Sequence, residues 1–199
     1  MNPSDKGELR KFIRGKRRSL SASEQAAAAA GLLEQLTTIP GISESRSIAL
    51  YLVNDGEIDP VEMMKWCWDS GIKTYVPVVY QEQINSLRFA EIHASSRLRE
   101  NQFGISEPVV EAGQLRSARQ LDLVLMPLVA FDQYGNRLGM GGGFYDTTFE
   151  FIRKQEVSRP VLIGIAHELQ KVDRILSESW DIPLDRVVTD KGVYCLGKG

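Results

Sequence analysis

The feature of this sequence that most constrains its fold is an alternation of short apolar runs with segments of helical periodicity. Residues 47–53 (SIALYLV) form a continuous run of strand-forming residues, as is typical of a strand covered on both faces. A helical segment ends at Gly71, and residues 73–79 (KTYVPVV) form the next apolar run. The order strand, helix, strand predicts a parallel pair joined by a right-handed crossover.

Further strands are expected along the rest of the chain. The candidates are residues 87–92, 121–131 and 160–167, and two short strands around a turn within 185–196. Strands that alternate with helices predict an α/β fold, an open sheet with helices on both faces.

Helix starts can be placed from capping signals. Ser4 can cap a first helix, and a capping box at residues 21–24 (SASE) begins a second helix that continues until Pro40 and Gly41. Asp59 is expected as the N-cap of a third helix, with Pro60 at its first position.

Length and composition indicate one globular domain over residues 1–199, because 43% of the residues are hydrophobic and 25% are charged. The formal net charge of -2 gives no reason to expect nucleic acid or a membrane as the main partner. Cys67 and Cys195 stand outside any C-x-x-C pair and are expected to be reduced thiols. No apolar run has the length of a membrane span, so we expect a cytoplasmic protein. A monomer is the expected oligomeric state, although no feature of the sequence determines it.

A glycine run, residues 137–146 (RLGMGGGFYD), is the main candidate for function. Glycines can adopt positive φ at little cost, so consecutive backbone N–H groups can point into one concavity that suits an anion. A helix is expected to start after the run, and its free N–H groups would add to the attraction for phosphate. Arg137 could contact a phosphate oxygen, and Asp146 could hold Mg²⁺ beside it. The alternative is an ordinary glycine-rich surface loop, since the run matches neither standard nucleotide-binding motif.

The first helix carries a basic stripe beside its apolar face. At roughly 100° per residue, its members fall within a sector of about 80°: Lys6, Arg10, Arg14 and Arg17. The stripe is either a binding surface for an anion or a solvated face.

Four segments in order resemble the 5-formyltetrahydrofolate cyclo-ligase family, also called methenyltetrahydrofolate synthetases. The long segment 127–146 (PLVAFDQYGNRLGMGGGFYD) is similar to the family signature, and the others are residues 56–59 (GEID), 103–108 (FGISEP) and 181–189 (DIPLDRVVT). The resemblance implies a three-layer α/β/α Rossmann-like fold, similar to ribose-5-phosphate isomerase and the CoA transferases. It also implies ATP- and Mg²⁺-dependent conversion of 5-formyltetrahydrofolate to 5,10-methenyltetrahydrofolate, with release of ADP and phosphate.

The resemblance also implies roles for individual residues. The ATP-binding set resembles the family's N-terminal Lys and Arg and its glycine loop, and comprises Lys6, Arg10, Arg137, Leu138, Gly139, Met140, Gly141, Gly142, Gly143, Phe144 and Tyr145. Arg137 and Tyr145 are the catalytic candidates, although Tyr145 could equally pack beneath the loop. Asp146 and Asp185 would hold Mg²⁺, with a turn residue as the alternative for Asp185.

For the folate substrate, the resemblance implies binding by Leu52, Glu57 and Phe103. A Glu57 carboxylate can accept paired hydrogen bonds from the 2-amino group and ring N–H of a pterin, whereas a turn-capping role is the alternative. We assign no role to His93 or His167. Some relatives place a basic residue at the position of Met140 or Gly142, so the cation that stabilises the transferred phosphoryl group would have to be Lys6, Arg10 or Arg137 here.

Two other functions remain open from the residues alone. A different α/β enzyme acting on sugar phosphates or CoA esters would use the same loop for an anion but need no ATP. A non-catalytic nucleotide or RNA binder would use the basic helix, although the helix lacks the interleaved aromatic residues of an RNA-binding patch.

Overall fold

A computed structural model describes residues 5–80, 84–101, 104–153 and 160–195. Its helices and strands follow one another in this order: α1 (Lys6–Arg18), α2 (Ala22–Thr37), β1 (Ser47–Ala49), α3 (Val61–Asp69), β2 (Lys73–Tyr80), β3 (Ser86–Glu91), β4 (Leu98–Glu100), β5 (Ser106–Pro108), η1 (Ala112–Gln114), η2 (Ala118–Gln120), β6 (Leu123–Pro127), β7 (Ala130–Phe131), β8 (Arg137–Leu138), α4 (Phe144–Thr148), α5 (Glu150–Arg153), β9 (Val161–Ala166), η3 (Glu168–Gln170), β10 (Arg186–Thr189) and β11 (Val193–Cys195).

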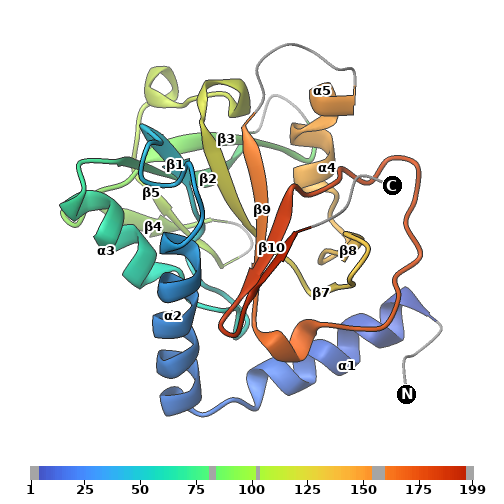
Figure 1. The fold of residues 1–199 in the computed structure, drawn as a ribbon. Coiled ribbons are helices and arrows are strands. Elements are labelled where there is room, and N and C mark those ends of the chain that lie inside the picture. The colour runs from blue at the N-terminus through green and yellow to red at the C-terminus, as the bar shows by residue number, and fades with distance from the viewer. Residues whose placement is uncertain (1–4, 81–83, 102–103, 154–159, 196–199) are drawn as a thin grey trace.

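A mixed seven-stranded sheet forms the centre of the fold, in the order β11-β10-β9-β6-β1-β2-β3 (Figure 1). Its five inner strands are parallel, and the two edge strands, β3 and β11, run antiparallel to their neighbours. The expected parallel pair of β1 and β2 and the expected final pair of short strands are therefore confirmed.

Helices cover both faces of the sheet because successive strand residues point to opposite sides. Ile48 packs in the core that contains the apolar residues of α2 and α3, whereas its neighbour Ala49 packs in the core that contains Phe149 and Phe151. Figure 1 shows α2 and α3 on one side of the sheet and α4 and α5 on the other. The expected α/β fold with three layers is thereby observed.

The first helix lies across one end of this sandwich (Figure 1). Leu9 and Ile13 of α1 pack against the β7–β8 hairpin and against Val172 and Ile175. In the described chain its N-cap is Asp5, whose side chain accepts a hydrogen bond from the backbone N–H of Glu8, while the expected cap, Ser4, lies outside the described residues. The hydrophobic stripe therefore docks α1 at the end of the sheet where the glycine loop begins.

Two expected strands are shorter than their apolar runs. The run 47–53 is a strand only as far as Ala49; the N–H of Leu50 still donates to the carbonyl oxygen of Tyr75, and residues 51–53 line a pocket. The run 121–131 is divided into β6 and β7, because the buried amide of Gln170 donates hydrogen bonds to the carbonyl oxygens of Leu128 and Val129 at the break. At this break the side chain of Gln170, and not a neighbouring strand, supplies the hydrogen-bond donors for these two carbonyl oxygens.

Helix boundaries also differ from the expectation at two places. Pro60 is the N-cap of α3 and not its first residue, although Asp59 still accepts a hydrogen bond from the N–H of Val61. The expected helix after the glycine run is divided into the short helices α4 and α5. The capping box at Ser21 and Glu24, in contrast, is present at the start of α2.

Other expectations concern the chain as a whole. In the described parts, no helix is both long and apolar enough to cross a membrane. Cys67 and Cys195 are both free, the first buried and the second exposed.

Candidate active site

The glycine loop, residues 139–143, connects β8 to α4 beyond the carboxyl end of β6. Gly141 and Gly143 have φ values of 100° and 68°, in the left-handed region that favours glycine. A Cβ atom at Gly142 would lie 2.9 Å from the ring of Phe144. The loop therefore needs glycine at 141 and 143 for backbone geometry, and at 142 it leaves little room for a side chain.

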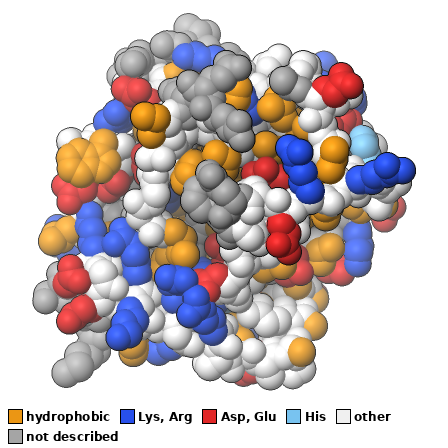
Figure 2. Space-filling model, turned by 180° about the vertical axis from the view of Figure 1, so that it is seen from behind, with side chains coloured by type: hydrophobic (Ala, Val, Ile, Leu, Met, Phe, Trp, Pro, Cys, Tyr) orange, Lys and Arg blue, Asp and Glu red, His pale blue; other side chains and the backbone are white. Residues whose placement is uncertain are grey.

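The first helix contacts this loop directly. Arg10 donates a hydrogen bond from Nε to the carbonyl oxygen of Gly139, at 2.8 Å. Lys6, one turn earlier, forms an ion pair with Glu178 at 3.1 Å, in which both side chains remain partly exposed. Figure 2 shows Lys and Arg side chains gathered over α1, at the lower left of that view, with acidic side chains among them. Two expected ATP contacts, Lys6 and Arg10, thus lie on one helix that touches the loop.

The arginine before the loop has partners within the protein. Arg137 is 7% exposed, and its two terminal nitrogens donate to the carbonyl oxygen of Ile182 and to Oδ1 of Asp146, each at 2.6 Å. The same Asp146 oxygen accepts the N–H of Ile182 at 3.0 Å. Arg137 and Asp146 therefore attach the start of α4 to the segment before β10.

The second expected metal ligand, Asp185, lies at the amino end of β9. Its Oδ2 accepts the N–H of Leu162 at 2.8 Å. Across the described residues, no group of three or more His, Cys, Asp or Glu side chains is arranged to hold a metal ion. A site for Mg²⁺ here would have to draw most of its ligands from water and from bound phosphate, as is usual for this ion.

A tight turn at residues 54–57 lies on the last turn of α1. Asp55, with φ 54°, accepts hydrogen bonds from three arginines of that helix: Arg14 at 2.7 Å, Arg17 at 2.7 Å, and Arg18. Burial would raise the pKa of Asp55, but these hydrogen bonds outweigh burial and hold the pKa at about 2. Half of the basic stripe on α1, Arg14 and Arg17, is therefore paired with this turn; Arg17 is buried, whereas Arg14 stays partly exposed.

Glu57, the expected pterin ligand, lies in the same turn and is mostly buried. Its Oε2 accepts the N–H of Asn54 at 3.2 Å, and its Oε1 lies 4.0 Å from the NH1 atom of Arg17. Burial raises the pKa of Glu57 to about 7, and the charge of Arg17 opposes part of that rise. Burial of an ionised carboxylate costs free energy, and hydrogen-bond donors of a bound ligand would offset that cost.

Tyr145 and His167 lie close to Glu57. The ring of Tyr145 stacks on that of Phe149, with centroids 6.3 Å apart and an angle of 8° between the rings. Burial and the charge of Glu57 both raise the pKa of Tyr145. His167 is 3% exposed, and its Nε2 lies 3.3 Å from the carbonyl oxygen of Gly56. Burial lowers the pKa of His167, so the ring is neutral at neutral pH.

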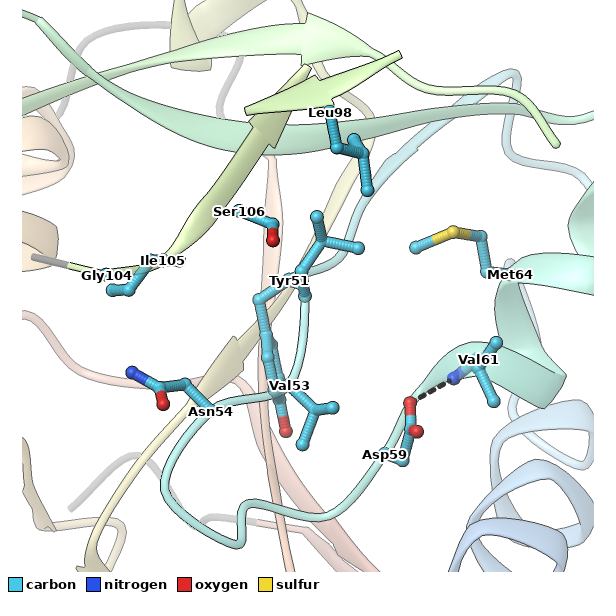
Figure 3. A pocket seen from close by; sticks show the side chains of 11 residues that line it. Tyr51, Val53, Asn54, Asp59, Val61, Met64, Leu98, Gly104, Ile105 and Ser106 are labelled. Carbon is cyan, nitrogen blue, oxygen red and sulfur yellow. Dashed lines mark hydrogen bonds between the residues drawn. The ribbon is translucent and has the colours of Figure 1, made fainter. Parts of the chain in front are cut away.

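A cavity of about 310 Å³ opens beside this turn. Figure 3 shows its side chains: the walls include Tyr51, Met64 and Leu98, and Asn54 and Asp59 provide polar atoms. Leu52, an expected folate contact, is one of the lining residues. Phe103 lies outside the described residues, whereas the segment that follows it, from Gly104 to Ser106, lines the same cavity. A mostly apolar pocket with a few fixed polar groups is the usual form of a small-molecule site.

Sequence reasoning missed several residues of this region. Arg17 was expected only as part of a basic stripe, Asp55 was not singled out, and His167 received no role. An Asn-Asp-Gly turn directly after a buried strand was the available signal for Asp55, because such turns fix carboxylates at strand ends. Nothing local in the sequence pairs it with arginines 37 to 41 residues away.

The fold and this region define an α/β protein in which most candidate ligand groups, though not Asp185 at the amino end of β9, lie near the carboxyl ends of a mostly parallel sheet, where such proteins bind their substrates. The family model of the 5-formyltetrahydrofolate cyclo-ligase family matches residues 2–190. The chain belongs to this family, as its sequence motifs indicated.

Individual relatives agree with this assignment. The chain is 36% identical to the 5-formyltetrahydrofolate cyclo-ligase of Escherichia coli, over 92% of this chain and 99% of that protein. It is 33% identical to the Haemophilus influenzae protein of the same name, over 92% and 97% of the two chains. The structure is similar to the 5,10-methenyltetrahydrofolate synthetase of Aquifex aeolicus, with a TM-score of 0.81, 31% identity, and coverage of 98% of this chain and 94% of that one. The corresponding synthetase of Mycoplasma pneumoniae has a TM-score of 0.71 and 26% identity, with coverage of 94% and 99%.

Proposed function

We propose that this protein converts 5-formyltetrahydrofolate to 5,10-methenyltetrahydrofolate, using ATP and releasing ADP and phosphate. Beyond family membership, one structural observation carries the proposal. Helix α1 contacts both regions: Arg10 donates to the carbonyl oxygen of Gly139 in the glycine loop, and Arg17 donates to Asp55 in the turn that carries Glu57. The loop proposed for ATP and the turn proposed for the pterin are therefore held against the same helix.

The reaction explains why two such sites must adjoin. The N5-formyl group is a formamide, and its carbonyl carbon is unreactive because of resonance with nitrogen. Transfer of the γ-phosphoryl group of ATP to the formyl oxygen forms an imidoyl phosphate and ADP. N10 then attacks the formyl carbon and gives up its proton, the C–O bond breaks, and inorganic phosphate leaves with that proton. No protein nucleophile is needed, so the protein contributes positioning and charge stabilisation.

ATP would lie against the glycine loop and α1. The backbone from Leu138 to Tyr145, including Met140 and Phe144, would surround the phosphates, and Lys6 and Arg10 would supply positive charge. Both cations are partly exposed and lie on the helix that touches Gly139. Arg137 has its terminal nitrogens on Ile182 and Asp146, which favours Lys6 or Arg10 as the cation that stabilises the transferred group.

The folate would bind between the 54–57 turn and the adjoining cavity. Glu57 would accept hydrogen bonds from the 2-amino group and a ring N–H of the pterin, and Leu52 would form part of the apolar wall. Phe103 is retained as a proposed contact on the resemblance alone. The raised pKa of Glu57 is consistent with a site that is completed by donors of the ligand.

Asp146 fits a role as a Mg²⁺ ligand. It is a partly exposed carboxylate three residues after Gly143, and an ion of this kind is commonly held by one or two carboxylates together with substrate phosphates. Asp185 is retained as the second ligand on the resemblance alone. When bound, the ion would neutralise charge on the phosphates, while Arg137 and Ile182 keep the Asp146 carboxylate oriented.

A direct assay tests the proposal. Purified protein is mixed with 5-formyltetrahydrofolate and Mg-ATP, and formation of the methenyl product is followed by its near-ultraviolet absorbance, together with release of one phosphate per product. Absence of product with folded protein, or full-rate product formation without ATP, would contradict the proposal. The first outcome would favour an α/β enzyme acting on sugar phosphates or CoA esters.

Three broader expectations stay predictions: a single domain over residues 1–199, a monomeric state, and a cytoplasmic location. Limited proteolysis tests the single domain, and size-exclusion chromatography with light scattering tests the monomeric state. Neither measurement depends on the enzymatic activity.

A further inference from the structure

Arg17 is a fully buried arginine whose hydrogen bonding is incomplete. It is 0% exposed, and it donates from Nε to the carbonyl oxygen of Asp55 at 2.9 Å and from NH2 to the Asp55 carboxylate at 2.7 Å. Its third nitrogen, NH1, has no hydrogen-bond partner among the described residues. A buried hydrogen-bond donor without an acceptor lowers the stability of the fold, so the presence of an arginine at position 17 is not explained by its hydrogen bonds to Asp55 alone.

The group within reach of this nitrogen is the Glu57 carboxylate, 4.0 Å away at Oε1. This separation is too long for a hydrogen bond, and a movement of about 1 Å would bring it into the range of a charge-assisted one. Because NH1 is inaccessible from the solvent side, a ligand atom reaches it less readily than Glu57 does.

The backbone holds both groups in place for this contact. A Cβ atom at Gly56 would lie 3.1 Å from the carbonyl oxygen of Arg17, so the turn packs directly on the end of α1. Glu57 is held at its other oxygen by the N–H of Asn54. Small side-chain motions can therefore close the gap while the helix and the turn stay where they are.

We propose that Arg17 is a positioning residue for Glu57: its unused NH1 group pairs with the Glu57 carboxylate and holds it ionised and oriented toward the pterin. This inference rests on the proposed function, because it assigns the partner of the proposed pterin ligand. It also gives α1 two tasks, since Arg10 of the same helix contacts the glycine loop.

The charged and titratable groups around Glu57 do not change their charge near neutral pH, so Glu57 is the group of this cluster that titrates there. They are Arg14 and Arg17 from α1, Asp55 in the same turn, Tyr51 after β1, Tyr145 from α4 and His167 after β9. Burial raises the pKa values of both tyrosines and lowers that of His167, so all three are neutral around pH 7. Asp55, with a pKa of about 2, is ionised throughout.

The test is the pH dependence of kcat/KM for 5-formyltetrahydrofolate at saturating Mg-ATP, between about pH 5.5 and pH 8.5. In the native protein the acid limb should follow ionisation of Glu57, and it should be absent in Glu57→Gln. In Arg17→Met the limb should move to higher pH by about one unit, which lowers kcat/KM about tenfold on that limb, because an opposite charge at this distance is lost. Arg17→Lys keeps the charge and should shift the limb less. KM for ATP should stay within about twofold in both variants.

Lys16→Met is the matched control, because it removes a neighbouring positive charge of α1 whose ammonium lies 4.6 Å over the ring of Phe12 and not at the turn. Its pH profile should coincide with that of the native protein. Arg17→Met leaves the buried Asp55 carboxylate without one of its partners, so unfolding in urea is measured in parallel, and Arg17→Gln, which also removes the charge, serves where Arg17→Met does not fold. A folded variant that lacks the charge and has an unmoved acid limb would overturn the inference, whereas an inactive native protein would overturn the proposed function itself.

Discussion

Arg10 donates a hydrogen bond to the carbonyl oxygen of Gly139 across a sequence separation of 129 residues. This contact joins the first helix of the chain to the glycine loop. The same helix holds the 54–57 turn at its other end through Asp55. One rigid helix therefore spans the two regions proposed for ATP and folate, and substitutions along it should separate their contributions.

At the loop end of that helix, Lys6→Met should raise KM for ATP several-fold and affect KM for folate less, because the ammonium is proposed to contact phosphate. Glu178→Gln is the matched control, since it removes the same 3.1 Å ion pair but leaves the ammonium in place. A surface pair of this kind contributes about 1 kcal/mol or less to stability, so both variants should fold. An equal rise of KM for ATP in both variants would show that the ion pair, and not the Lys6 charge, matters.

Gly141→Ala should destabilise the protein by about 1–2 kcal/mol, because an L-residue at φ 100° is strained. Gly139→Ala should change the free energy of unfolding by less than about 0.5 kcal/mol, since it lacks such a φ and a Cβ there meets no atom within 4 Å. Urea unfolding of the two variants measures the difference. Equal values would mean that the loop adopts another conformation in solution.

Asp146→Asn tests the proposed metal ligand without removing the local hydrogen bonds. The amide oxygen can still accept from Arg137 and from the N–H of Ile182, but the negative charge is lost. We expect the Mg²⁺ concentration for half-maximal activity to rise by about tenfold or more, together with some loss of unfolding free energy, because the mostly buried Arg137 loses its charged partner. If the variant needs the same Mg²⁺ concentration as the native protein, Asp146 is not a metal ligand.

Asp55 should make the stability of the protein dependent on acid pH. Its pKa is about 2 in the folded protein against an ordinary value of 3.8, so its contribution is complete above pH 3.8 and is lost as the pH falls toward 2. Allowing for solvent screening, that contribution is on the order of 1–2 kcal/mol. The difference in unfolding free energy between the native protein and Asp55→Asn should therefore shrink as the pH falls over this range. A difference that is constant with pH would contradict the role of the arginine hydrogen bonds.

The sequence by itself determined the α/β class, the parallel β1–β2 pair, the capping box of α2 and the family. These features depend on local patterns: strand residues alternate faces, capping residues bond to neighbours three positions away, and the glycine run is contiguous. The glycine run also predicted correctly that a helix starts directly after it, whereas the β7–β8 hairpin before it was not predicted.

Only the tertiary structure decided which charges meet. Arg14 and Arg17 share a helix face with Lys6 and Arg10 in the sequence pattern, yet the first two are bound to Asp55, Arg10 contacts the glycine loop and Lys6 pairs with Glu178. Likewise, Arg137 is directed to Asp146 and Ile182 and away from solvent. The reason is physical: a charge selects its partner by distance and burial, and both are set by how α1 docks through Leu9 and Ile13, a packing between segments far apart in the chain.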